Sequence, residues 1–179
     1  MVEVNGRVLA LRTARDEMVA ARERLMRAVA GRPDAELLRS PAKGGWSAAE
    51  VLDHLRTAES QAVKAMTRIS KGEPTRIPKR CWYYRLPMTP VFWSIRVPAP
   101  KPVQPRPVAD LVPRQVIEEM AASRSALLAL IQSMGEEAFS RFVMPHFLLG
   151  RFTGVDWLRF IGGHETKHAG QIERTLAGL

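Results

Sequence analysis

The chain has 179 residues, a formal net charge of +9 and one cysteine. This length can bury a core without staples, so we expect one domain over residues 1–179, and a single cysteine excludes an internal disulfide framework, which fits a reducing cytoplasm. We expect no signal peptide, because the N-terminal segment is charged and has no long apolar core, and the longest apolar uncharged run in the middle of the chain, residues 86–95, is too short to span a membrane.

The first segment predicts an amphipathic helix from about Asn5 to Ala30. Apolar residues recur there every three or four positions, and Gly31 and Pro33 end the pattern. Alternating charges, among them Arg22, cover the opposite face. We expect these charged side chains to lie on the solvated surface.

A second helix is predicted from Ser47 to about Gly72. Ser47 and Glu50 form the capping-box pattern that marks a helix start. His54 lies on or beside the apolar stripe of this helix, where an unpaired imidazole is costly. A hydrogen bond is the common way to meet that cost, and a metal ion is another.

Residues 72–113 form a proline-rich insert, with ten of the thirteen prolines of the chain, so no regular helix can persist there. The segment from Lys71 to Arg114 also carries +7 of the net charge, and because no helix outside it has a basic face, we expect no sequence-specific nucleic-acid binding. We expect residues 98–107 to be extended polyproline-like chain. The aromatic residues of the insert predict a flap that packs on its own domain or across a homodimer: Trp82, Tyr83, Tyr84, Phe92 and Trp93.

Two further helices follow, one from Pro113 to about Met134 and one capped by Thr153. Residues 135–152 predict an apolar connection with at most one short turn of helix. Strand-like alternation of useful length and a Gly-rich phosphate loop are both missing from the sequence. The pattern predicts an all-α fold, a four-helix bundle with a long proline-rich insert between helices 2 and 3.

The last helix carries a histidine pair that can bind a metal. His164 and His168 are four residues apart and share one helix face, so both imidazoles can reach one zinc or nickel ion. His54 is the candidate third ligand, although such a pair also occurs by chance on solvated faces. The letters H-E-T-K-H match the zinc-protease signature, but Gln171 and Arg174 stand where its metzincin extension needs Gly and His.

Three motif blocks in order resemble the DinB-like superfamily, four-helix-bundle proteins related to metal-dependent thiol transferases. They are the Trp-Ser of W-S-A-A-E-V-L-D-H-L at residues 46–55, the His eight residues after that Trp, and the late H-E-T-K-H-A-G-Q-I at residues 164–172. The resemblance implies that His54, His164 and His168 bind one divalent ion with an open position for water or a thiol.

The resemblance implies a metal-dependent transferase or hydrolase acting on a small molecule such as a low-molecular-weight thiol. Glu165 is the first candidate for a catalytic base, and Gln171 is expected to point into the same cavity. His146 is expected in the pocket wall and not as a ligand. The alternative is a non-enzymatic binding protein with a structural metal, whose basic aromatic flap grips an anionic partner.

Overall fold

The computed structural model describes residues 2–42, 44–75, 98–146 and 149–178. Most of these residues are helical and the strands form one short hairpin, so the predicted all-α class is confirmed. The elements are α1 Val2–Val29, α2 Asp34–Leu38, α3 Ala48–Ser70, η2 Lys101–Val103, η3 Val108–Asp110, α5 Pro113–Met134, α6 Glu136–Arg141, β1 Val143–His146, β2 Gly150–Thr153 and α7 Gly154–Ala177.

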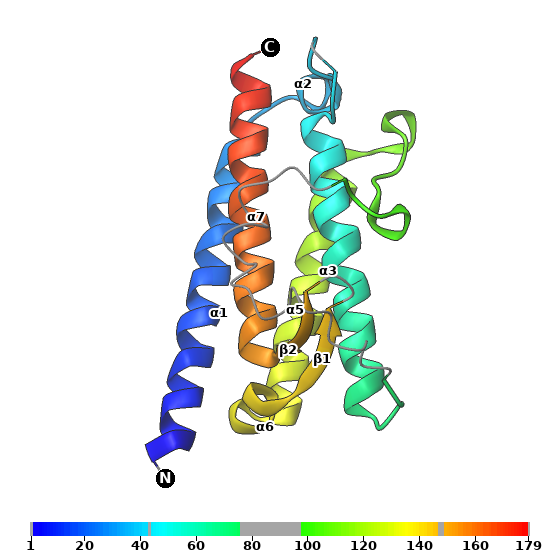
Figure 1. The fold of residues 1–179 in the computed structure, drawn as a ribbon. Coiled ribbons are helices and arrows are strands. Elements are labelled where there is room, and N and C mark those ends of the chain that lie inside the picture. The colour runs from blue at the N-terminus through cyan, green and yellow to red at the C-terminus, as the bar shows by residue number, and fades with distance from the viewer. Residues whose placement is uncertain (1, 43, 76–97, 147–148, 179) are drawn as a thin grey trace.

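The four long helices lie side by side (Figure 1), with α1 along α7, α3 along α5, and further contact between α3 and α7. Figure 1 shows that α1 and α7 run in one direction while α3 and α5 run in the other. The chain must therefore return along a helix length between α3 and α5. The 22 residues of α5 span about 33 Å, a distance that about ten extended residues can cover. The 42 residues between α3 and α5 far exceed that need.

The helix starts follow the predicted capping chemistry. The backbone N–H of Ser47 donates to Glu50 Oε2 at 2.8 Å, and the Glu50 N–H donates back to Ser47 Oγ at 3.2 Å. Thr153 and Asp156 form the same reciprocal pair at the start of α7. Each pair satisfies two backbone donors that a helix start leaves unpaired. Glu50 therefore acts as a cap.

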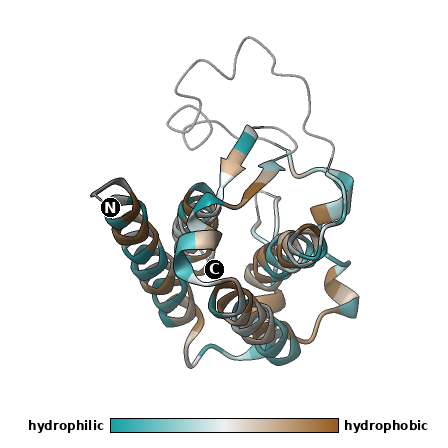
Figure 2. Cartoon of the chain, turned by 90° about the horizontal axis from the view of Figure 1, so that it is seen from below, coloured by the Kyte–Doolittle hydropathy of each residue, from teal (hydrophilic) through white to brown (hydrophobic). Residues whose placement is uncertain are grey.

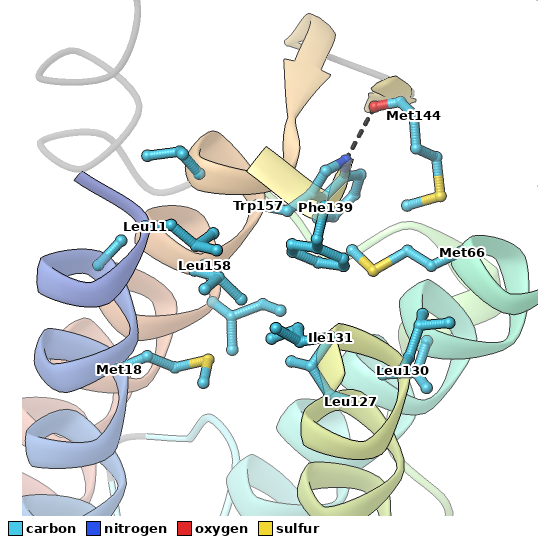
Figure 3. Close-up of a cluster of buried hydrophobic side chains, with 14 residues drawn as sticks. Leu11, Met18, Met66, Leu127, Leu130, Ile131, Phe139, Met144, Trp157 and Leu158 are labelled. Atoms are coloured by element: carbon cyan, nitrogen blue, oxygen red, sulfur yellow. Dashed lines mark hydrogen bonds between the residues drawn. The ribbon is translucent and has the colours of Figure 1, made fainter. Parts of the chain in front are cut away.

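Two clusters of buried apolar side chains hold the helices together. All four long helices contribute to both clusters, because each helix is amphipathic and carries hydrophobic as well as hydrophilic residues (Figure 2). The first cluster is drawn in Figure 3 and includes Leu11, Met66, Leu127, Phe139 and Leu158. The second includes Leu25, Leu52, Val116, Met120 and Ile172.

A layer of four charged side chains separates these two clusters along every long helix: Arg22 of α1, Glu59 of α3, Arg124 of α5 and Glu165 of α7. Arg124 donates to Glu59 Oε1 at 2.8 Å and to Glu165 Oε1 at 2.9 Å. Arg22 binds the same two carboxylates. We call these four residues the charged layer. The prediction that Arg22 lies on the solvated surface is wrong, since only 13% of its side chain is exposed.

The segment before α7 contains the short helix that the prediction allowed and, in addition, a hairpin that was not predicted. It contains the short helix α6 and an antiparallel hairpin in which Met144 pairs with Phe152. The indole of Trp157 donates to the carbonyl oxygen of Met144 at 2.8 Å (Figure 3), which ties the hairpin to α7. Each strand has four residues and β1 contains Pro145, so no alternation in this segment is long enough to predict a strand.

The second described part of the insert, residues 98–112, is only partly the extended chain that we expected for residues 98–107. It contains the two 3₁₀ turns η2 and η3, and a proline immediately precedes each of them. The five aromatic residues on which the flap prediction depends lie outside the described residues. Within the described ranges, no helix is both long and apolar enough to cross a lipid bilayer.

Candidate metal centre

His54 of α3 and His164 and His168 of α7 meet where these two helices are in contact. The Nε2 atoms of His54 and His164 are 3.2 Å apart, and those of His168 and His164 are 3.1 Å apart. One ligand atom from each ring lies within 4.8 Å of the other two. The structure therefore brings together the three residues that the sequence nominated as ligands.

In two of these rings the second nitrogen, Nδ1, is hydrogen-bonded to a carbonyl oxygen. Nδ1 of His54 is 2.6 Å from the carbonyl oxygen of Val103, and Nδ1 of His168 is 2.8 Å from Oε1 of Gln171. A carbonyl oxygen only accepts, so each Nδ1 carries the hydrogen and each Nε2 presents a lone pair. Gln171 thus acts within the site, as expected, by orienting His168.

The three imidazoles cannot satisfy one another by hydrogen bonds. Nε2 of His164 carries at most one hydrogen, so it can donate to His54 or to His168 but not to both. At least one contact near 3.1–3.2 Å then joins two lone pairs. A bound cation removes this repulsion, so the donor set fits a metal ion.

The pKa values of the three histidines also favour neutral rings that can bind a metal. Burial lowers the pKa of His164 well below its ordinary value, and the neighbouring His168 and His54 lower it further. Burial also lowers the pKa of His54, and that of His168 to about 4. The three rings are therefore neutral near pH 7 and can donate lone pairs to a metal.

The separations of His164 Nε2 from the Nε2 atoms of His54 and His168 also suit a metal. Zinc binds imidazole nitrogen at roughly 2.0–2.1 Å, so two such ligands at a tetrahedral angle lie about 3.3 Å apart. The observed contacts of 3.1 and 3.2 Å are close to this value. Aromatic rings flank the site, with Trp46 at 5.1 Å from the His54 ring centroid and Phe160 at 5.7 Å from that of His164.

Glu165 and His146 occupy other surroundings. Oε1 of Glu165 accepts hydrogen bonds from Arg22 and Arg124 in the charged layer. Its role as a base stays a prediction. His146 is buried among aromatic rings, with centroid distances of 4.6 Å to Phe160 and 5.4 Å to Trp157.

Sequence reasoning missed the Val103 carbonyl and the charged layer. A backbone acceptor leaves no mark in the residue type, so no signal pointed to Val103. The charged layer was visible in principle, because Glu59 and Arg124 lie in the predicted helices close to the apolar stripe. Their burial together required the mutual arrangement of four helices.

Comparison with known families gives the same assignment. The model of the DinB superfamily matches residues 17–172, a range that includes all of α3 and α5, parts of α1 and α7, and the three histidines. The chain belongs to the DinB superfamily. Among curated DinB relatives, the uncharacterized protein YuaE of Bacillus subtilis (strain 168) is 31% identical over 145 residues, which cover 80% of this chain and 85% of YuaE. No solved structure shows a significant match.

Proposed function

We propose that this DinB-superfamily protein is a four-helix bundle that binds one divalent metal ion, zinc or nickel, through His54, His164 and His168. We further propose that it is a metal-dependent transferase or hydrolase. The observation that carries the proposal is the convergence of three Nε2 atoms, two of them with lone pairs fixed toward the third. Three protein ligands are typical of catalytic zinc sites, whereas structural sites usually have four.

A divalent ion bound there supplies Lewis acidity, which lowers the pKa of a coordinated water or thiol into the neutral range. The residues of the chain orient the three imidazoles and shield them from water. The Val103 carbonyl and Gln171 each hold one imidazole in the tautomer that donates from Nε2. Trp46 and Phe160 pack against two of the rings, where they exclude water from the ligand side chains.

The proposed substrate is a small molecule that brings its own nucleophile, with a low-molecular-weight thiol as the first choice. A thiol needs less help from a general base than water does, because its ordinary pKa is far lower. This matters here because Glu165, the candidate base that the sequence offers, already accepts hydrogen bonds from two arginines. The thiol reaction does not require Glu165 to release them.

The test begins with protein stripped by a chelator and reloaded with zinc or nickel. The loaded protein is assayed for transfer of small thiols to an electrophilic acceptor and for hydrolysis of activated esters and amides. We expect turnover that disappears on chelation and in His164→Ala, but persists in His146→Gln, which alters a buried histidine outside the ligand set. Metal binding without turnover on any of these substrates would refute the enzymatic part of the proposal.

A further inference from the structure

The described end of the insert lies against the metal ligand His54. Residues 99–106 contact α3 at three points, and we call these residues the strap. The strap is separate in sequence from all three ligands. It comes from the long connection whose length the crossing between α3 and α5 does not explain.

The first two contacts use consecutive carbonyl groups at the end of the 3₁₀ turn η2. The Pro102 carbonyl oxygen accepts from Gln61 Nε2 at 2.6 Å, and the Val103 carbonyl oxygen accepts from His54 Nδ1 at 2.6 Å. His54 and Gln61 are seven residues apart and therefore lie on the same face of α3. The turn offers both carbonyls to that face.

The third contact is an ion pair beside His54. Asp53 is fully buried, and its Oδ2 accepts from the backbone N–H of Arg106 at 2.8 Å. Its Oδ1 accepts from Nε and Nη2 of Arg106, at 3.1 and 2.8 Å. Arg56 also donates to Oδ1 at 2.8 Å. Asp53 thus fixes both the backbone and the side chain of the strap at Arg106.

The strap itself is internally restrained. The N–H of Val103 donates to the Pro100 carbonyl at 3.0 Å, and the side-chain amide of Gln104 donates to the Ala99 carbonyl at 3.1 Å. Pro100, Pro102 and Pro105 fix further backbone angles in this short stretch. A carbonyl held in this way is a stable reference point for an imidazole.

We propose that the strap is a positioning element for the metal site: Asp53 and Gln61 anchor it, and its Val103 carbonyl holds His54 in the tautomer and orientation that direct Nε2 at the metal. This inference rests on the proposed metal site and assigns a role to the insert. Partners of this kind, which bind the far nitrogen of a ligating histidine, typically contribute 10–100-fold to metal affinity.

The test loosens both anchors while leaving every ligand in place. The variants are Gln61→Ala, Arg106→Ala and the double variant, with Arg114→Ala as the matched control, because Arg114 is exposed and pairs only with Glu118 among the described contacts. Zinc affinity is measured by competition with a chromophoric chelator. We expect the double variant to bind zinc about 10–100-fold more weakly, each single variant to fall between, and Arg114→Ala to match the wild type.

A second readout does not depend on the metal. Nitrogen NMR of the metal-free wild type should show His54 with its hydrogen on Nδ1, and the double variant should show a mixture of the two tautomers. Wild-type zinc affinity in the double variant, or an Nε2–H tautomer in the wild type, would overturn the proposal. If the wild type binds no zinc but shows the expected tautomer, the metal site fails and the strap contact stands. If Arg106→Ala does not fold, Gln61→Ala gives the same two readouts.

Discussion

Glu165→Gln separates the structural role of Glu165 from its predicted catalytic role. The substitution keeps the shape of the side chain and removes its charge. Glu165 Oε1 accepts from Arg22 Nε at 2.8 Å and from Arg124 Nη2 at 2.9 Å, and both Glu165 and Arg124 are buried. Burial lowers the pKa of Arg124, but the carboxylates of Glu165 and Glu59 together have a larger effect and raise this pKa above its ordinary value. The variant leaves two arginines facing one carboxylate.

The expected loss of stability follows from this imbalance. Breaking a buried ion pair from one side typically costs about 3–5 kcal/mol, because the remaining charge stays buried without compensation. With a urea dependence of about 2 kcal/mol per molar, the unfolding midpoint should fall by roughly 2 M. Such a loss is a large share of the roughly 5–15 kcal/mol that holds a domain folded.

The assay is urea unfolding of metal-free protein, with Glu173→Gln as the matched control. Glu173 lies on the same helix and pairs with Arg24, but 42% of its side chain is exposed. Removing that solvent-exposed pair should therefore leave the unfolding midpoint almost unchanged. A midpoint for Glu165→Gln within error of Glu173→Gln would refute the reasoning about the charged layer. If Glu165→Gln were as stable as the wild type but lost turnover, the predicted role as a base would be favoured instead.

Three further predictions concern pH, packing and metal linkage. Burial lowers the pKa of His146 from its ordinary 6.5 to about 4, so the unfolded chain binds more protons between these values. The free energy of unfolding should therefore fall by about 2 kcal/mol as the pH is lowered from 6.5 to about 5. Urea unfolding of His146→Gln should lack this part of the pH dependence. Equal pH dependence in the wild type and the variant would contradict the prediction. A Cβ on Gly162 would stand 3.0 Å from the Met18 Cα, so Gly162→Ala should cost about 1–3 kcal/mol and lower the thermal midpoint. Gly170→Ala is the control, because only flexible arginine side chains lie near that position, and it should not lower the thermal midpoint. Zinc at about 100 times its Kd should stabilise the protein by about 2.7 kcal/mol, and in His168→Ala the thermal midpoint should no longer respond to zinc.

Much of the fold could be predicted because local rules and the tertiary arrangement agree. The third predicted helix matches α5 at both ends, since Pro113 suits a first helical turn and Gly135 follows its last residue with a positive φ of 78°. The starts of the second and fourth predicted helices follow from the capping pairs of Ser47 and Thr153. The hairpin could not be predicted, because its strands are only four residues long and the bond from Trp157 to the Met144 carbonyl that ties it to α7 is a tertiary contact.

The candidate ligands of the proposed metal site could be predicted for a different reason. Spacing within α7 placed His164 and His168 together, and His54, beside the apolar stripe of another predicted helix, was the candidate third ligand; the resemblance to a family then strengthened this assignment. Arg22 shows the limit of this reasoning. Within one helix Arg22 looks like a surface charge, whereas in the fold most of its side chain is covered and binds carboxylates on α3 and α7. The predicted homodimer and the flap aromatics stay predictions.

X-ray absorption spectroscopy of the zinc-loaded protein tests the central claim most directly, because it counts and identifies the ligands of the ion. The account predicts one zinc per chain with three imidazole nitrogens at roughly 2.0–2.1 Å. The imidazole signal should fall in His54→Ala, His164→Ala and His168→Ala, and should be unchanged in His146→Gln. A shell of oxygen ligands without imidazole, or one that survives His164→Ala unchanged, would contradict the three-histidine site.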